Sequence, residues 1–229
     1  MLATFTEQAK QALETIRAEQ RAANESCDES KHIPQDKMLE EQNYPFYLNK
    51  DQLIRFLRAR DYDIPKTTQM YVNWVKWRLD YRADRIDPEQ IRAMLEKETI
   101  KMVGHSIDNS LVILVQARYH EPTAQHIDDL VRYGIFITEQ AIQRLEREGR
   151  KPCIHVIYDR TGMTNANRDY ALIKLSYKMI GMLQDFYCER LGNFYVLGAN
   201  WVYWAAFKII KAFLAQKTRD KIHIINNNE

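Results

Sequence analysis

The apolar positions of the chain follow a helical period over roughly its first hundred residues. Residues 2–23 place apolar side chains at helical spacing and are followed by a polar run, which predicts an amphipathic helix and a linker. Similar patterns over 50–60, 64–82 and 88–97 predict further helices, with Asp63 as the N-cap of the second. This part of the chain is therefore expected to consist of helices joined by a linker and turns, without strands.

From residue 111 onward, short strand patterns alternate with long helical ones. The strands are rich in β-branched residues and are bounded by the longer helices. The predicted strands are 111–115, 154–158, 194–197 and 222–225, and the predicted helices are 125–148, 167–190 and 201–217. Such alternation favours a mostly parallel sheet covered by helices. We therefore expect an α/β fold with an all-α N-terminal cap.

Composition and charge narrow the class of protein. The 229 residues are 45% apolar, which is enough for a substantial core and argues against intrinsic disorder. A net charge of +2 gives no overall field for binding nucleic acid. No run of about 18 apolar residues occurs, so we expect a chain that is soluble or peripheral to a membrane. Three scattered cysteines fit a reducing compartment.

The sequence lacks the common motifs of nucleotide-binding and hydrolytic sites. Its seven glycines form no G-x-G-x-x-G, no phosphate-binding loop and no G-x-S-x-G. Cys153 and Arg160 superficially resemble a thiol nucleophile with an anion-binding arginine, but Cys153 would lie along a buried strand. His120 and His126 lack the spacing of metal ligands on one helix face. We therefore expect neither catalysis nor a metal or cofactor.

Several other polar residues have simple structural interpretations. Arg58 and Arg60 end a short basic helix, where they would complement the dipole of its C-terminus. His155 and His223 alternate with apolar neighbours on predicted strands, which favours histidines that face the sheet or are hydrogen-bonded within the protein. Taken alone, these residues do not indicate a function.

Four blocks between about residues 50 and 226 nevertheless share the pattern of one family. The blocks are Leu53–Asp63 with Trp74–Arg78, Ile157–Gly162, Tyr187–Leu197, and Phe213–Ile222. In order, they resemble the N-terminal helical signature, the strand ending in D-x-x-G, the Y-P-E-R-x-G block and the F-L-x-x-K-T-x-x-K-I ending of the CRAL-TRIO superfamily, which includes phosphatidylinositol transfer proteins. The resemblance implies a sheet that floors an apolar pocket for one lipid, with a mobile helix as its gate.

The resemblance also implies a headgroup site. Arg60, Glu189, Thr218 and Lys221 match positions that hold an inositol phosphate in the phosphoinositide-binding members of the family. Arginine and lysine suit a phosphodiester, and a hydroxyl adds a further hydrogen bond. The simpler alternative stays open: Glu189 with Arg190 would form a helix-terminal salt bridge, and Lys221 would be a solvated charge.

The gate is expected over residues 201–215. The side chains expected to dock on a membrane are Trp201, Trp204, Phe207, Lys208 and Lys211. The stripe expected to face inward is Val202, Ala206, Ile209 and Phe213. Tryptophan and lysine on one helix face suit a membrane interface, although a protein partner would explain the exposed tryptophans equally well.

The sequence departs from the family pattern in three respects. Cys188 replaces the usual proline, and Ile154 and Val156 replace the hydroxyl residues that would hold a choline headgroup. The domain is also expected to be short at its C-terminal end. Of these departures, Ile154 and Val156 argue against a choline lipid, whereas Cys188 would loosen the local turn without changing its charges.

We therefore predict non-enzymatic binding and transfer of an anionic phospholipid such as phosphatidylinositol. Residues 1–48 would be a docking tail, 49–98 a helical unit and 99–229 the lipid-binding domain. The expected partners are a phospholipid and a membrane surface, without nucleic acid, and the expected location is cytoplasmic and peripheral to membranes. The alternative is a structural subunit of a large membrane-associated complex, for which protein partners and a mitochondrial location stay open.

Overall fold

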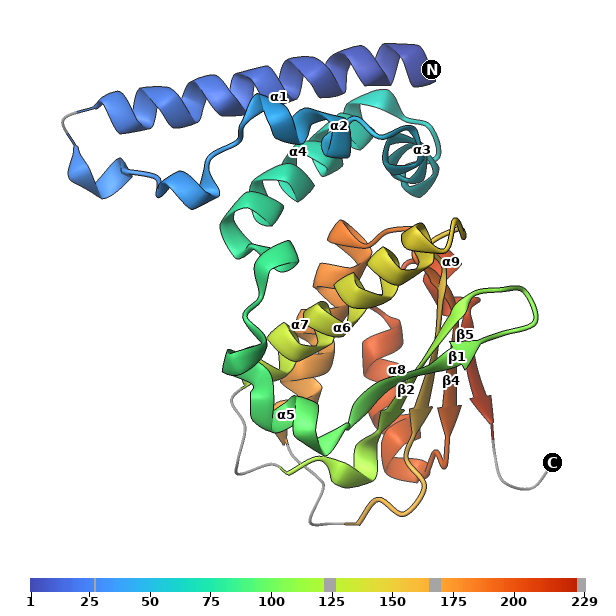
Figure 1. The fold of residues 1–229 in the computed structure, drawn as a ribbon. Coiled ribbons are helices and arrows are strands. Elements are labelled where there is room, and N and C mark those ends of the chain that lie inside the picture. The colour runs from blue at the N-terminus through green and yellow to red at the C-terminus, as the bar shows by residue number, and fades with distance from the viewer. Residues whose placement is uncertain (27, 122–126, 165–169, 226–229) are drawn as a thin grey trace. The chain divides into compact units, whose positions relative to one another are not determined.

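The structure, a computed structural model, describes residues 1–26, 28–121, 127–164 and 170–225. Its contacts divide the chain into two compact units, Met1–Asp84 and Arg85–Glu229. The first unit is helical and the second combines a mostly parallel sheet with helices (Figure 1). The predicted fold class is confirmed.

The first unit is helical because its caps and apolar stripes agree. It contains α1 (Leu2–Glu25), α2 (Tyr44–Tyr47), α3 (Lys50–Ala59) and α4 (Ile64–Tyr81), with single turns of 3-10 helix between α1 and α2. The Asn49 side chain caps α3, and the Asp63 side chain accepts a hydrogen bond from the third residue of α4. The predicted cap at Asp63 is confirmed.

The core of this unit is aromatic and includes α1. Phe5 on α1 is fully buried and meets Tyr71 of α4 edge-to-face, with 5.7 Å between ring centroids. Tyr71 in turn contacts Phe56 of α3 at 5.6 Å. Such edge-to-face pairs add to the free energy gained from burying apolar area. The first helix is thus an integral part of the core of the unit.

The second unit carries a five-stranded sheet in the order β1-β2-β3-β4-β5. Its elements are α5 (Arg92–Lys97), β1 (Ile100–His105), β2 (Leu111–Gln116), α6 (Ile127–Arg147), β3 (Ile154–Asp159), α7 (Tyr170–Phe186), β4 (Leu191–Leu197), α8 (Trp201–Lys211), α9 (Gln216–Arg219) and β5 (Ile222–Ile225). Only β1 runs antiparallel to its neighbour. The sequence analysis missed β1, because Lys101, Gly104 and His105 interrupt its apolar pattern.

The two faces of the sheet differ in character. Successive parallel strands joined by right-handed connections place α6, α7 and α8 on the same face, as Figure 1 shows. That face carries Leu111, Ile154 and Val196, all buried. The other face carries His155 and, on the edge strand, the exposed His223. The sheet therefore has one apolar face beneath its helices and one partly polar face.

Candidate functional site

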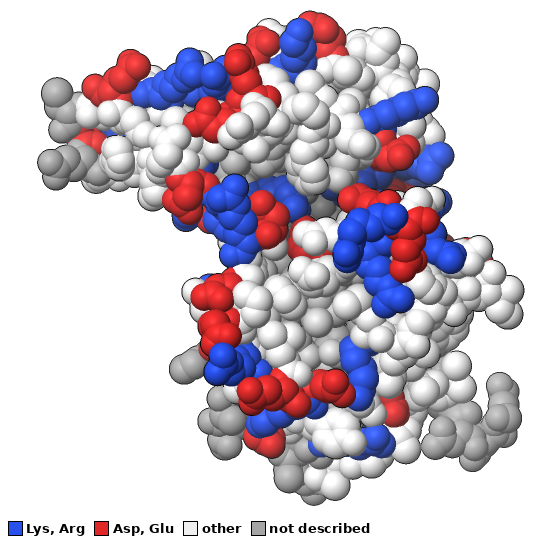
Figure 2. Space-filling view, viewed as in Figure 1, with Lys and Arg blue, Asp and Glu red and all other residues white. Residues whose placement is uncertain are grey.

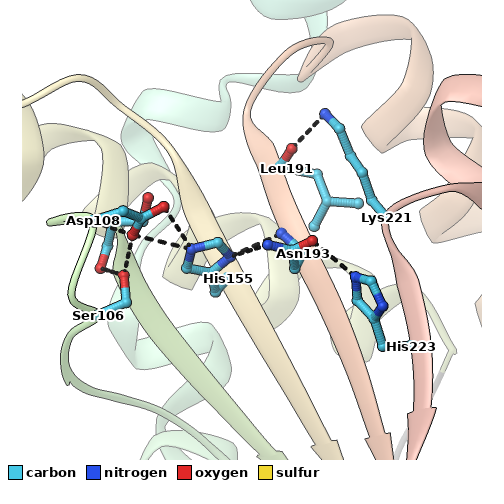
Figure 3. Close-up of polar contacts among 8 residues, drawn as sticks. Ser106, Asp108, His155, Leu191, Asn193, Lys221 and His223 are labelled. Atoms are coloured by element: carbon cyan, nitrogen blue, oxygen red, sulfur yellow. Dashed lines mark hydrogen bonds and ion pairs between the residues drawn. The ribbon is translucent and has the colours of Figure 1, made fainter.

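Lys221 lies at the amino ends of the last two parallel strands, next to the start of β4. Its ammonium group donates a hydrogen bond to the carbonyl oxygen of Leu191 at 2.7 Å (Figure 3). The carbonyl oxygen of Lys221 accepts from the N–H of Phe194 at 2.8 Å, so its backbone is held as well. An ammonium has three donors. Lys221 is thus a half-buried, positioned cation rather than the freely solvated charge of the simpler alternative.

Glu189 reaches the same edge of the sheet through a tight turn. Its φ of 60° is left-handed, a conformation that costs a residue with a Cβ about 1–2 kcal/mol, and its side chain is exposed. Tyr187 and Arg190, which lie on either side of Glu189 in the sequence, are buried. The Tyr187 hydroxyl donates to Glu139 at 2.5 Å, and the guanidinium of Arg190 lies 3.7 Å from Glu146. Arg190 therefore pairs with α6, which leaves the predicted salt bridge between Glu189 and Arg190 without support.

Thr218 lies close to Lys221, whereas Arg60 lies in the other unit. Thr218 is half-buried in α9, and its carbonyl oxygen accepts from the N–H of Lys221 at 3.2 Å. Arg60 follows the last residue of α3 within Met1–Asp84. The second unit therefore brings together Glu189, Thr218 and Lys221 at one edge of the sheet.

A chain of polar contacts crosses the partly polar face beside Lys221 (Figure 3). The Nε2 atom of His155 lies 3.2 Å from the carboxylate of Asp108, and its Nδ1 accepts from the backbone N–H of Asn193 at 2.8 Å. The side-chain oxygen of Asn193 lies 2.9 Å from Nε2 of His223. Because Nδ1 of His155 is an acceptor, Nε2 carries the proton and donates to Asp108. The interpretation of both histidines as hydrogen-bonded within the protein is confirmed.

The carboxylate of Asp108 is held in its charged form. The hydrogen bond from the Ser106 hydroxyl is the largest cause that lowers the pKa of Asp108 well below its usual range. The backbone N–H of Ser110 and the side chain of His155 lower this pKa further. The polar chain is therefore anchored on a permanent negative charge in the β1–β2 turn.

A bulge in β4 explains how this polar chain forms. Between the pairs Ile154–Leu191 and Val156–Phe194, β4 has one residue more than β3. The N–H of Asn193 is thereby free to donate to His155 instead of a backbone carbonyl. A Cβ at Gly192 would lie 2.6 Å from the His155 ring, so only glycine fits at this position. The sequence analysis missed this role of the glycine in its Tyr187–Leu197 block.

Helix α8 exposes more apolar surface than predicted. Trp201 is 80% exposed and Trp204 40%, as expected, but Ile209 is 60% and Phe213 63% exposed. The inward stripe was therefore wrong for Ile209 and Phe213, and the side chains of Val202 and Ala206 lie outside the described residues. The half-buried Phe207 stacks on Tyr203 and meets the ring of Trp204 edge-on at 6.5 Å between centroids. The ring of Tyr203 in turn lies 6.5 Å from that of Tyr158 on the sheet.

Side-chain hydrogen bonds hold the chain at the start of α8 and just after its end. The side chain of Asn200 caps its first turn by accepting from the N–H of Tyr203 at 3.0 Å. At the other end, the amide of Gln184 on α7 donates to the carbonyl of Phe213 at 3.3 Å and accepts from the N–H of Ala215 at 2.9 Å. The predicted helix 201–217 is interrupted there, with α9 as a separate turn. Between these ends, the ring of Tyr203 lies near Tyr158 of the sheet, while Ile209 is exposed.

Charged side chains are unevenly distributed over the second unit. Figure 2 shows acidic and basic side chains gathered above and below a mostly uncharged area in the middle of this unit. Lys208 and Lys211 on α8 are exposed. Among the described residues, no group of three His, Cys, Asp or Glu side chains is suited to hold a metal ion. Nor does any helix within these ranges combine the length and apolarity of a transmembrane span.

The CRAL/TRIO domain matches residues 96–229, which is more than half of the chain. The chain belongs to the CRAL/TRIO domain family. The Sec14 cytosolic factor of Schizosaccharomyces pombe is 29% identical over 209 residues, covering 83% of this chain and 71% of that protein. The phosphatidylinositol transfer protein CSR1 of Eremothecium gossypii is 28% identical over 184 residues, covering 74% of this chain and 41% of that protein.

A solved structure has a similar fold. The crystal structure of Sfh5 matches 95% of this chain and 80% of its own with a TM-score of 0.69, at 17% sequence identity. At that identity the likeness shows the fold alone. Glu189, Thr218 and Lys221 fall inside the matched CRAL/TRIO segment, whereas Arg60 precedes it.

Proposed function

We propose that this CRAL/TRIO protein binds an anionic phospholipid such as phosphatidylinositol and transfers it between membranes without enzymatic chemistry. The observation that carries the proposal is the exposed face of α8, where tryptophans and lysines lie together. Tryptophan favours the interface between water and lipid, and lysine favours anionic headgroups. The relative named as a phosphatidylinositol transfer protein supports the choice of lipid.

The headgroup would bind at the amino ends of β4 and β5. Lys221 is already oriented by Leu191, so little side-chain entropy would be lost when it meets a phosphate. Thr218 would add a hydroxyl, and Glu189, presented by its left-handed turn, would accept from an inositol hydroxyl. Arg60 belongs to the other unit, so its assignment to the headgroup rests on the family resemblance alone.

Energetics require that loading takes place at a membrane. Exposing two acyl chains with about 30 methylenes to water would cost a transfer free energy of roughly 24 kcal/mol, at about 0.8 kcal/mol for each methylene. A carrier must therefore meet the bilayer before the lipid leaves it. The face of α8 with Trp201, Trp204, Lys208 and Lys211 would make that contact, and α8 would act as the gate.

The test replaces both exposed tryptophans by alanine. We expect the Trp201→Ala/Trp204→Ala variant to lose roughly tenfold or more of its affinity for vesicles containing phosphatidylinositol, and transfer of labelled lipid to fall in parallel. Ile107→Ala is the matched control, because Ile107 is a fully exposed apolar residue in the β1–β2 turn. If the double variant binds and transfers lipid like the control, α8 is not the docking element.

A second candidate is a structural subunit of a membrane-associated complex. The outward positions of Ile209 and Phe213 favour it, since they extend the apolar surface of α8 beyond the tryptophans. In a complex, a protein partner would cover this surface. Native mass measurement distinguishes the two functions: a free monomer with exchangeable lipid fits transfer, while quantitative recovery in a large assembly fits a structural role.

A further inference from the structure

Arg160 is a buried arginine at the carboxyl end of β3, on the same sheet face as α8. Its N–H donates to the carbonyl of Leu197 at 3.0 Å, so the extended path of the strand continues through it. Side chains two residues apart on a strand share a face. Arg160 therefore lies on the face of Tyr158, and its guanidinium lies 4.6 Å from the ring centroid of Tyr203 on α8.

The charge of Arg160 is poorly compensated. The residue is only 9% exposed. Among the described residues, its Nε is buried without a hydrogen-bond partner and its Nη2 meets only the sulfur of Met163 at 3.4 Å. Within the described parts of the chain no carboxylate lies within ion-pair distance of it. The neighbouring Asp159 instead accepts from the N–H of Thr161 at 2.8 Å. Buried arginines are normally paired, because an uncompensated charge is costly.

Arg190 shows what a paired arginine looks like in the same unit. It is also 9% exposed, but its guanidinium lies 3.7 Å from Glu146 and donates to the carbonyl of Pro152 at 3.4 Å. The ring of Tyr203 gives Arg160 only part of this stabilisation, because an aromatic face attracts the cation but does not accept in the plane of its N–H groups. Within the described residues, one donor edge of Arg160 thus lacks an acceptor.

Two phenols lie near Arg160: Tyr203, whose ring the guanidinium covers, and Tyr158, whose ring lies 6.5 Å from that of Tyr203. Burial raises the pKa of Tyr203 to about 12 and also raises the pKa of Tyr158, while the positive charge of Arg160 acts in the opposite direction on both. Both hydroxyls therefore keep their protons at neutral pH and can donate. An arginine with two phenols is a donor set suited to the oxygens of a carboxylate or phosphate.

We propose that Arg160 binds the anionic group of an amphiphile held between the sheet and α8. The inference rests on the proposed lipid-binding function, because the apolar body of the amphiphile would lie between the sheet and α8. It concerns a different position, since Lys221 lies at the amino ends of the parallel strands and Arg160 at a carboxyl end. β3 has six residues, so at about 3.3 Å each the two positions are roughly 20 Å apart along the strands.

The experiment compares two probes that differ only in the terminal group: a C18 fatty acid and the matching C18 fatty alcohol. We expect the full-length protein to bind the acid about tenfold or more tightly than the alcohol. Arg160→Gln should remove this preference and leave alcohol binding within about twofold. Arg147→Gln is the matched control, because Arg147 is an exposed arginine on α6 that should keep the preference.

Three outcomes would overturn the proposal. The first is equal affinity of the wild-type protein for acid and alcohol. The second is an equal loss of both probes in Arg160→Gln, which would make Arg160 a structural support of Tyr203. The third is displacement of the fatty acid by inorganic phosphate at a similar concentration, which would make the site one for free anions.

A measurement on the wild-type protein keeps the test valid if Arg160→Gln does not fold. The Nε–H resonance of Arg160 should shift on titration with the fatty acid and stay in place with the alcohol, and no shift with the acid overturns the proposal. Lys221→Ala separates this position from the proposed headgroup site. That variant should reduce phosphatidylinositol transfer and keep the preference for acid over alcohol, and loss of the preference would show that only one site exists.

Discussion

Gly192 shows at the scale of a single residue why a motif position is fixed. The ideal Cβ of any other residue at this position would lie 2.6 Å from Cε1 and 2.7 Å from Nδ1 of His155. The ring cannot easily move away, because Asn193 and Asp108 hold its two nitrogens. Glycine is therefore needed at position 192 because a side chain there would collide with His155. It would affect a headgroup site only through the position of that ring.

We expect Gly192→Ala to destabilise the protein by about 1–3 kcal/mol, the usual cost of forcing extra volume into a packed site. In a His155→Ala background the same change should cost much less, because the ring that it meets is gone. The measurement is a double-mutant cycle of urea unfolding. Gly181→Ala in α7 is the control, since nothing lies within 4 Å of its Cβ position. Equal costs in both backgrounds would disprove the steric explanation.

Helix α8 shows, at the scale of an element, why an apolar sequence pattern does not always reveal which residues of a helix face the core. Its sequence is apolar on several sides, so periodicity alone did not determine which residues face inward. The ring of Tyr203 lies near Tyr158 on the sheet, whereas Ile209 is exposed. The two hydrogen bonds of Gln184 tie the segment that follows α8 to α7.

Removing the contact from Gln184 should loosen the end of α8. We expect Gln184→Met to increase amide hydrogen exchange at residues 212–215 by roughly tenfold, because two hydrogen bonds of about 0.5–1.5 kcal/mol each are lost. Exchange in β3 should not change. Gln143→Met, at an exposed position of α6, is the control. If both variants exchange alike over 212–215, Gln184 does not hold α8.

Helices and strands were predicted correctly from the sequence where the pattern of apolar residues was clear. Long periodic segments gave α1, α4 and α6, and buried β-branched runs gave the parallel strands. It missed β1, whose pairing with β2 rather than its own pattern makes it a strand. The partners of Lys221 and Arg160 were also out of reach, because they depend on strand register and on the rotation of α8, which are set by residues far away in sequence.

At the scale of the whole molecule, the proposed lipid-binding residues are concentrated in the second unit. The second unit holds the exposed face of α8, Glu189, Thr218, Lys221 and Arg160, so both proposed anion positions belong to one sheet. The first unit has a core that α1 helps to build. A segment that served only to dock on partners would contribute little to that core.

The place of α1 in the molecule can therefore be tested through stability. Leu13 is fully buried, so Leu13→Ala should cost about 2–5 kcal/mol, from lost apolar burial and the cavity left behind. Hydrogen exchange should rise at the amides of α4, which packs against α1. Glu14→Ala, at the exposed neighbouring position, should leave exchange unchanged. Unchanged exchange in α4 for Leu13→Ala would instead mark residues 1–48 as a separate docking tail.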